Sequence, residues 1–583
     1  MNALDYQLNL ETMYSKANID KIVIKEIDSK STLFTRTMDV LASSCCFITD
    51  HAYETFDMSI KDCAHAVWIE VLKDSKDKHI QSIGTLIGNR FGYDGVTAIN
   101  KGTEVIVACA EIGIYDLILF DNSKIVKPTM RLSLDVVKSI DKLQYQPPMV
   151  CIPNPWKAND DGGWLSLEKH VVLGEGNHHK GKQNLACLNK LQLIPWEIDQ
   201  HVLFNFIDNK EYKGDREILI DFLDKPFYFV WRYDKRGRMY SEGYNINLQS
   251  NELRKSMITI AKAEKLSKEG IMWLKVGIAN AFGKDKWSFN KRIAWFNSCK
   301  SLDLDKAEDK IIASKLVNAY QKGQNGDAVK SNMFLDATNS GMQVMAALSN
   351  CSKTAKAVNM IGKKRMDAYQ VIADLMNDQL DKSDHVNREE TKYPLMTHYY
   401  NSKERPRQEF NDAQLGAFYN ALDGQFPGAE DVMSSINECW EDKDHYVWTL
   451  PDGHKAVIRS KVTSGTSIHM LGGEFYYEYT EYKASGNGNH LAPNIIHSID
   501  GYIAREMVKR CEFPLAHIHD AFTCHPNHMD DVCWTYKSIM AEIADSNLLQ
   551  DILREITGNN SLIYKKLGSS LAKDIKASSH MLS

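Results

Sequence analysis

The sequence predicts an α+β protein with more than one domain. Its 583 residues are 43% apolar, which is enough to bury several hydrophobic cores. Short apolar runs such as Met333–Leu335 and Leu515–Ile518 are typical of buried strands, whereas Asn251–Trp273 has the apolar spacing of a long helix. We find no internal repeat and no long linker, so we expect adjoining globular domains.

The N-terminal part, residues 1–138, is expected to be a small mixed domain. The apolar runs at 22–27, 105–110 and 115–120 are typical of strands, and segments of helical period separate them. Its function cannot be derived from these residues.

A carboxylate follows the predicted strand Met333–Leu335. Asp336 stands at the end of this strand, and apolar residues recur with helical period after Ser340. A carboxylate at a strand end, followed by a turn that contains Gly341, is well placed to hold a divalent cation.

A second aspartate follows the predicted strand Leu515–Ile518. His519 and Asp520 come next, at a hairpin or strand edge. Either aspartate alone is more typical of a turn or a helix cap. If the fold brings Asp336 and Asp520 together, they could bind two Mg²⁺ ions that stabilise the attacking and leaving oxygens of a phosphoryl transfer.

The segment REETKYPLMTHYYNSK, residues 388–403, suggests what the metals act on. It places Arg388, Lys392 and Tyr400 at offsets that keep them near one face of a helix. Positive charge would neutralise the phosphates of a nucleoside triphosphate, and the tyrosine would shape its sugar pocket. An ordinary solvated helix face is the alternative, and the two aspartates outweigh it. Pro394 is expected to kink or restart the helix.

Composition restricts the compartment and the partners. The net charge of −6 disfavours a protein that is basic throughout, although a basic cleft on an acidic body would still bind nucleic acid. The twelve cysteines form no C-x-x-C pair and no zinc spacing, which indicates reduced thiols. No signal peptide, transit peptide or membrane span is predicted, so we expect a cytoplasmic protein without a membrane partner.

Taken in order, several segments resemble the single-subunit, bacteriophage-type DNA-dependent RNA polymerases. The resemblance covers roughly residues 140–530. The segments that carry it are YDKRGRMY (233–240), DATNSGMQ (336–343), R-x-x-x-K followed by M-T-x-x-Y (388–400), APNIIHSIDG (492–501) and HIHDAF (517–522). The residues after both aspartates, and the M-T-x-x-Y ending, are similar to the RNA-synthesising branch rather than to the related DNA polymerases.

The resemblance implies a role for each matching residue. Asp336 and Asp520 would ligate two catalytic Mg²⁺ ions, with the carbonyl of Ala337 as a further ligand. Lys392 would hold the triphosphate and protonate the pyrophosphate, and Arg388 would neutralise the outer phosphates. Tyr400 would select the ribose with His497 as its polar partner, His519 would position the metal site or primer end, and Arg236 and Arg238 would contact nucleic acid. For His519, a strand-edge histidine without a catalytic role is the alternative.

The same resemblance implies an α+β right-hand polymerase with palm, fingers, a minimal thumb and a small mixed N-terminal domain. The expected divisions are a reduced N-terminal domain (1–138), an N-terminal and thumb-remnant region (139–226), the first part of the palm (227–347), fingers with a hairpin at 454–483 (348–490), and the second part of the palm with the C-terminal tail (491–583). The hairpin would turn at Gly472-Gly473 and either read promoter bases or serve only as structure. The implied partners are a DNA template, nascent RNA and ribonucleoside triphosphates, in the cytoplasm of a phage-infected bacterium.

The region expected to hold the thumb is short. Only residues 207–226 separate the segment around Trp196 from YDKRGRMY. We therefore hypothesise a poorly processive polymerase, or one that depends on an accessory protein for promoter opening or template retention. A primase-like enzyme that makes short RNA on single-stranded DNA is the alternative among enzymes. A catalytically silent nucleic-acid-binding homologue is the alternative from another class.

Overall fold

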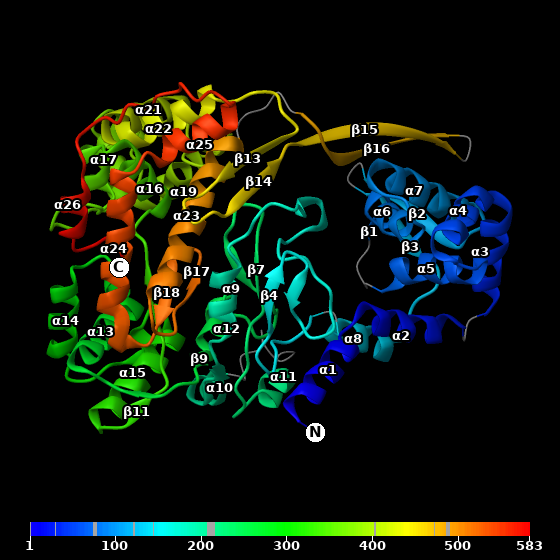
Figure 1. The fold of residues 1–583 in the computed structure, drawn as a ribbon, viewed down its shortest axis with the longest axis horizontal. Helices are drawn as coiled ribbons and strands as arrows, with labels where there is room; N and C mark the ends of the chain where they lie inside the picture. Colours follow the sequence, from blue (N-terminus) through cyan, green and yellow to red (C-terminus); the bar gives the residue numbers. More distant parts are fainter. Residues whose placement is uncertain are drawn as a thin grey trace. The chain divides into compact units, whose positions relative to one another are not determined.

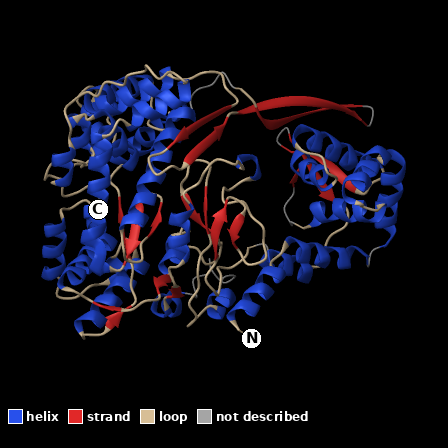
Figure 2. Cartoon of the chain, in the orientation of Figure 1, coloured by secondary structure: helices blue, strands red, loops and turns tan. Residues whose placement is uncertain are grey.

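The computed structural model divides the chain into two compact units. The first comprises Asp5–Gln146 and Ser460–Ser485, and the second comprises Pro147–Arg459 and Gly486–Ser583. Helices dominate both units and short antiparallel sheets complete them, as Figures 1 and 2 show. The structure describes residues 2–28, 31–73, 78–120, 123–143, 145–206, 216–401, 404–470, 473–484 and 490–583.

The first unit is mainly helical. Antiparallel strands in the order β1-β3-β2 form a small sheet in it. The elements up to residue 143 are α1 (Ala3–Met13), α2 (Lys16–Asp28), α3 (Ser31–Ser44), α4 (Cys46–Phe56), α5 (Ile60–Leu72), β1 (Lys78–His79), α6 (Ile80–Arg90), α7 (Gly95–Glu111), β2 (Tyr115–Phe120), β3 (Ser123–Pro128) and α8 (Leu134–Leu143).

Two of the three strands predicted in this unit are helices. Residues 22–27 lie in α2 and residues 105–110 lie in α7, whereas 115–120 is strand β2 as predicted. The run in α7 is apolar because the helix is buried on most sides, and such a run does not distinguish helix from strand. α7 also lies very close to α6, since a Cβ on Gly102 would stand 1.8 Å from the carbonyl oxygen of Gly84.

A long hairpin belongs to the first unit. Strand β15 (Lys461–Met470) pairs with β16 (Gly473–Tyr482), and β16 contacts α6 and α7. The hairpin predicted at 454–483 therefore begins later than expected, because residues 455–459 form β14 and pair with a different strand, β13. Gly473 begins β16, and Gly472 lies outside the described residues.

The second unit holds all the predicted site residues. Its strands are β4 (Asn154–Ala158), β5 (Asp161–Gly163), β6 (Trp196–Ile198), β7 (Trp231–Tyr233), β8 (Met239–Ser241), β9 (Ile258–Ile260), β10 (Glu264–Lys265), β11 (Ala328–Val329), β12 (Met333–Asp336), β13 (His445–Thr449), β14 (Lys455–Arg459), β17 (Ala516–Ile518) and β18 (Ala521–Cys524). Its α-helices are α9 (Leu185–Gln192), α10 (Gln200–Phe206), α11 (Arg216–Asp221), α12 (Glu252–Ser256), α13 (Lys268–Ala279), α14 (Phe289–Ser298), α15 (Lys310–Gln324), α16 (Ser340–Ser349), α17 (Ser352–Ala357), α18 (Ala368–Asn377), α19 (Arg388–His398), α20 (Glu404–Glu409), α21 (Asp412–Gln425), α22 (Pro427–Glu438), α23 (Leu491–Arg510), α24 (Met529–Asp545), α25 (Leu548–Thr557) and α26 (Ala572–Lys576).

The long helix predicted at Asn251–Trp273 is interrupted. Asn251 caps the short helix α12, and the β-branched run Ile258–Ile260 forms β9, which pairs with β6. The side chain of Ser267 then caps α13. The prediction failed because the pairing partner of β9 lies some sixty residues earlier in the chain, outside any local window.

A three-stranded antiparallel sheet, β12-β18-β17, lies at the centre of the site. The helices α16, α23 and α24 contact one another beside it. Gln343 on α16 is fully buried and donates hydrogen bonds to the carbonyl oxygens of Thr338, Val358 and Met581. These bonds fix the turn that follows Asp336.

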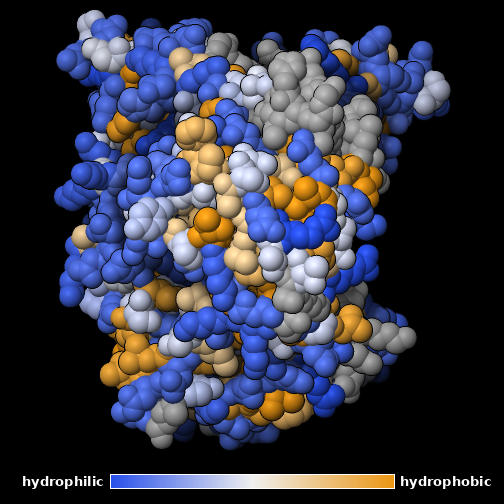
Figure 3. Space-filling model, turned by 90° about the vertical axis from the view of Figure 1, so that its right-hand side faces the viewer, coloured by the Kyte–Doolittle hydropathy of each residue, from blue (hydrophilic) through white to orange (hydrophobic). Residues whose placement is uncertain are grey.

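The surface of the described residues gives no sign of a membrane span. Within these residues no helix combines the length and the apolar character that crossing a bilayer requires. On the face drawn in Figure 3, hydrophilic side chains predominate and apolar ones are interspersed.

Candidate active site

The sheet brings Asp336 and Asp520 to one edge. Asp336 ends β12 opposite Ala521 of β18, and Asp520 directly precedes Ala521 in the tight turn after β17. The amide of Ala337 donates a hydrogen bond of 3.3 Å to the carbonyl oxygen of Asp520, which ties the two segments together. The predicted strand, helix start and hairpin in these segments are all confirmed.

The carboxylates at this edge repel one another. Burial raises the pKa of Asp520, and the nearby charges of Asp336 and Asp500 raise it further. Burial also raises the pKa of Asp336, although its side chain keeps an accessible surface in the cavity. Asp500 comes from α23 and is itself buried. Asp336 and Asp520 form no ion pair among the described residues, and two such carboxylates side by side attract a cation.

Asp336 and Asp520 suit Mg²⁺ better than a metal ion whose ligands must all come from the protein. Among the described residues there is no cluster of three or more His, Cys, Asp or Glu side chains that would form a complete metal cage. Mg²⁺ needs only one or two carboxylates when waters and substrate phosphates complete its coordination. Asp336 and Asp520 supply that set, and the carbonyl of Ala337 remains a predicted ligand.

The helix α19 presents the predicted phosphate-binding side chains. Asn387 and Glu390 form a capping box at its first turn. Arg388 pairs with Asp367 at 2.7 Å and also with Glu389, while Lys392 makes no hydrogen bond or ion pair with any described residue. The predicted restart of the helix at Pro394 is wrong, because α19 continues to His398 with Pro394 and Leu395 buried, whereas the alternative prediction of a kink stays a prediction.

Tyr400 lies just beyond the last turn of α19, against His497. Their ring centroids are 4.8 Å apart. The Nδ1 atom of His497 accepts a 2.8 Å hydrogen bond from Arg236, so the proton of the neutral ring must sit on Nε2. Burial, with Arg238 and Arg236 nearby, lowers the pKa of His497 to about 2, and Nε2 has no partner among the described residues. His497 is therefore a neutral hydrogen-bond donor that packs against the ring of Tyr400.

The remaining predicted residues surround the aspartates. Arg238 pairs with Asp500 at 2.6 Å, and Arg236 pairs with Asp234 at 2.7 Å. His519 has a left-handed backbone (φ 55°) in the turn before Asp520, and its ring packs edge-on against Tyr240. The arginines thus carry internal partners, and their contact with nucleic acid stays a prediction.

A cavity of about 380 Å³ unites these groups. Its lining includes Arg238, Asp336, Ala337, Lys392, Tyr400, His519 and Asp520. Arg388 lines an adjoining cavity. His497 does not line the first cavity but packs against Tyr400, which does. Segments separated by up to about 280 residues therefore converge as the sequence predicts.

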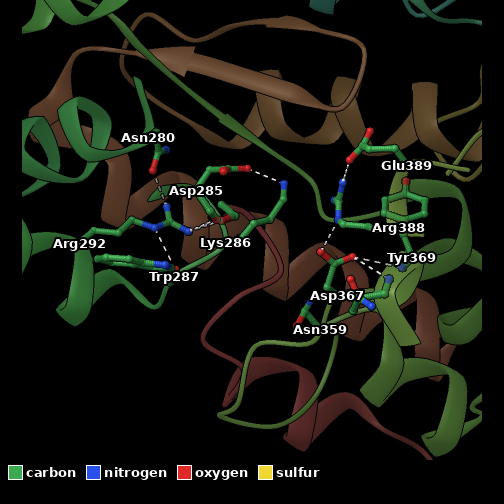
Figure 4. A network of polar contacts seen from close by, with 12 residues as sticks. Asn280, Asp285, Lys286, Trp287, Arg292, Asn359, Asp367, Tyr369, Arg388 and Glu389 are labelled. Atoms are coloured by element: carbon green, nitrogen blue, oxygen red, sulfur yellow. Dashed lines mark hydrogen bonds and ion pairs between the residues drawn. The ribbon is translucent and has the colours of Figure 1, made fainter. Parts of the chain in front are cut away.

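The structure adds residues that the sequence did not single out. Asp285 pairs with Lys286 at 2.5 Å, and both line the cavity beside Arg388. Figure 4 shows this pair together with the Asp367–Arg388 pair. Tyr369 lies under the guanidinium of Arg388 at 5.3 Å. Asp500 stood in a segment already singled out, APNIIHSIDG, although no role was predicted for it.

The end of the chain reaches the same edge. The backbone N–H of Ser583 donates to the carbonyl oxygen of Asp336 at 2.8 Å, and Met581 and Leu582 are buried. The tail therefore supports the segment that carries Asp336.

Comparison with known proteins finds similarity to one family. The sequence model described as DNA-dependent RNA polymerase matches residues 264–448, which include Asp336, Lys392 and Tyr400. Over this segment the chain is similar to DNA-dependent RNA polymerases, in agreement with the resemblance seen in the sequence. The family model ends before Asp520, so the second aspartate rests on the geometry.

The relatives to which the chain is similar include proteins from fungi and plants. A probable DNA-directed RNA polymerase of Gelasinospora sp. (strain G114) is 24% identical over 486 residues, covering 66% of this chain and 58% of the relative. One from Neurospora crassa is 26% identical over 409 residues, covering 56% and 45%. The mitochondrial DNA-directed RNA polymerase 1 of Nicotiana sylvestris is 24% identical over 397 residues, covering 56% and 39%.

The chain spans about half the length of these relatives. The name of the plant relative places it in mitochondria, and the names of the fungal relatives give no compartment. These relatives therefore give no support to the bacterial host cytoplasm expected from the phage resemblance.

Proposed function

We propose that this chain synthesises RNA on a DNA template, joining ribonucleoside triphosphates and releasing pyrophosphate. The observation that carries the proposal is the cavity in which Asp336 and Asp520 meet Lys392 and Tyr400. Paired carboxylates, a cation and a phenol around one cavity suit a nucleotide with its phosphates at one end and its sugar at the other.

In the proposed reaction, the 3′-oxygen of the RNA forms a bond to the α-phosphorus of the incoming nucleotide. The bond from that phosphorus to the bridging oxygen of pyrophosphate breaks, and the proton of the 3′-hydroxyl passes to solvent. Two Mg²⁺ ions at Asp336 and Asp520 would activate the 3′-oxygen and stabilise charge on the leaving oxygens. Lys392, which has no other partner among the described residues, would bind the phosphates and give the leaving pyrophosphate a proton.

The ribose would be selected at Tyr400. Its ring packs against His497, whose buried Nε2–H has no partner among the described residues, and we propose that both groups hydrogen-bond a ribose hydroxyl. A site built to hydrogen-bond a hydroxyl rejects substrates that lack it, because its polar groups are then left unpaired.

In this proposal the second unit is a right-hand polymerase core, with the β12-β18-β17 sheet in the palm and α19 in the fingers. The described residues between β6 and β7 form only the short helices α10 and α11, with 207–215 outside the description. We extend the proposal to low processivity, or an accessory protein that retains the template. Long runoff transcripts from the pure protein at a low ratio of enzyme to template would disprove this extension, and products of only a few nucleotides would favour primase-like synthesis.

The direct test is extension of an RNA primer on a DNA template with Mg²⁺. Extension with ribonucleotides is the expected result, and extension with deoxynucleotides only would place the chain in the DNA-polymerase branch. Absence of extension in both mixtures, with binding of the primed template retained, would favour the silent homologue.

Tyr400→Phe is expected to relax the choice of sugar. Ribonucleotide extension should stay within about threefold of the unaltered protein, while the ratio of deoxynucleotide to ribonucleotide kcat/KM should rise at least about tenfold, because the phenolic hydroxyl no longer enforces the ribose contact. Tyr393→Phe makes the same chemical change at an exposed residue of α19, the helix that precedes Tyr400, and is the matched control. An unchanged ratio in Tyr400→Phe would remove Tyr400 from sugar selection.

A further inference from the structure

A second cavity, of about 220 Å³, adjoins the first at Asp336. The two share Asp336, Ala337, Asn339, Tyr369 and Lys392 in their linings. The second cavity is also lined by Lys286, Arg365 and Arg388, none of which lines the first. The second cavity therefore offers further cations to the phosphates of a nucleotide bound at Asp336 and Lys392.

Arg365 reaches this cavity from a loop. The sequence KKR at 363–365 lies in an irregular segment between α17 and α18. Lys363 and Lys364 are exposed, whereas Arg365 is half-buried on the cavity wall. The loop is therefore able to send one of its three cations inward.

The loop is held in shape around Arg365. Asn359 has a left-handed backbone (φ 61°), its side-chain amide donates to the carbonyl of Met366 at 3.0 Å, and its side-chain oxygen accepts from the Met366 amide at 2.6 Å. Directly after this clamp, Asp367 caps α18 and pairs with Arg388. These contacts fix the backbone on the C-terminal side of Arg365.

The guanidinium of Arg365 lacks a partner. Its Nε atom is buried without a hydrogen bond, and no described residue forms an ion pair with it. The nearest carboxylates are engaged elsewhere, since Asp285 pairs with Lys286 and Asp367 pairs with Arg388 (Figure 4). Burial lowers the pKa of Arg365, and neighbouring Arg388 contributes. A buried donor without an acceptor costs free energy unless a ligand supplies one.

The surroundings distinguish this cavity from the larger one next to it. A cavity of about 680 Å³ shares Lys286, Arg388 and Lys392, but carboxylates balance its cations. These carboxylates include Glu252, Glu308, Asp309 and Glu389. Beside Arg365, by contrast, the carboxylates are those of Asp285, Asp367, the terminal Ser583 and the proposed metal ligand Asp336. Once a metal occupies Asp336, the four cations Lys286, Arg365, Arg388 and Lys392 outnumber the remaining carboxylates.

We propose that Arg365 binds a pyrophosphate group in this cavity, both as the β- and γ-phosphates of the incoming nucleotide and as the product after transfer. The proposal rests on the function proposed above. A planar guanidinium with free donors matches two phosphate oxygens at once, and such charge-assisted bonds are about twice as strong as neutral ones. Lys286, Arg388 and Lys392 would neutralise the remaining charge.

The test compares Arg365→Ala with Lys364→Ala, which removes the same charge from an exposed neighbour in the same loop. Calorimetry with Mg²⁺ should show inorganic pyrophosphate binding about tenfold more weakly to Arg365→Ala, and unchanged binding to Lys364→Ala. The same titration with a ribonucleoside α,β-methylene triphosphate separates the two forms of the ligand. Weaker binding of either probe to Arg365→Ala supports the site, and weaker binding of pyrophosphate alone assigns the site to the product.

Kinetics provide the second readout. Arg365→Ala should raise the KM for pyrophosphate in the reverse reaction about tenfold, and the thermal midpoint should not fall, because Arg365 makes no ion pair that holds the described fold together. Equal binding of both probes by Arg365→Ala and the unaltered protein would overturn the proposal. If the unaltered protein extends no primer, the proposed function fails, while calorimetry still decides whether Arg365 binds pyrophosphate.

Discussion

Asp520→Asn should abolish primer extension and at the same time stabilise the protein in the absence of divalent cations. The loss of activity is expected to reach about 1,000-fold or more, since a metal ion contributes several kcal/mol of transition-state stabilisation. The gain in stability has a separate origin. Burial, Asp336 and Asp500 all raise the pKa of Asp520, so its charge is unfavourable in the folded state. Removing that charge should increase the free energy of unfolding by on the order of 1 kcal/mol at neutral pH.

Mg²⁺ provides the internal check on this prediction. The ion binds only the folded site, so adding it should raise the thermal midpoint of the unaltered protein and have a smaller effect on Asp520→Asn. Asp531→Asn makes the same chemical change on an exposed turn of α24 and should alter neither property. Asp520 is not a metal ligand if the asparagine variant keeps a tenth of the extension rate or responds normally to Mg²⁺.

The sequence predicted the parts of this site whose chemistry is local. An apolar run followed by Asp336 and then by helical spacing describes a strand, a turn and a helix in consecutive residues, and the structure has all of them. The hairpin that carries Asp520 could be predicted for the same reason, because its two strands are consecutive in the sequence. The positive residues on α19 followed from their spacing along one helix.

What could not be predicted depends on contacts between distant segments. Whether Arg365 points into the site or into solvent is decided by the clamp at Asn359, and nothing in the letters KKR separates it from Lys364. Asp500, the partner of Arg238, and His497, one of the two partners of Arg236, likewise come from α23. At residues 105–110, by contrast, the prediction from the sequence is wrong. Because α7 is buried on most sides, its residues form an apolar run that resembles a strand.

Asp452→Asn is expected to destabilise the second unit by about 3–5 kcal/mol, the cost of leaving one member of a buried ion pair alone. Arg505 has no exposed side-chain surface and Asp452 has 2%, and their charged atoms are 2.5 Å apart. Arg505 also donates a 2.6 Å hydrogen bond to the carbonyl of Gly237. Gly237 has φ +87°, and a Cβ there would stand 2.7 Å from the guanidinium. The pair therefore supports the turn between Arg236 and Arg238.

The effect should depend on pH with a definite sign. Burial alone would raise the pKa of Asp452, but the charge and hydrogen bonds of Arg505 outweigh burial and hold the pKa at about 2. An aspartate with a depressed pKa stabilises the fold fully above its unfolded value of about 3.9, and that stabilisation disappears as the pH falls toward 2. In denaturant titrations, the difference between the unaltered protein and Asp452→Asn should be constant from about pH 7 to pH 5 and shrink below about pH 4.

A double variant separates stability from positioning. Asp452→Leu with Arg505→Met removes both charges, so it should recover much of the stability that Asp452→Asn loses. It cannot restore the hydrogen bond to Gly237, and the KM for the primed template should stay raised if that bond positions Arg236 and Arg238. Lys306→Met, which breaks an exposed pair with Asp303, should cost less than about 1 kcal/mol. A double variant with normal stability and a normal KM would show that the buried pair does not position this turn.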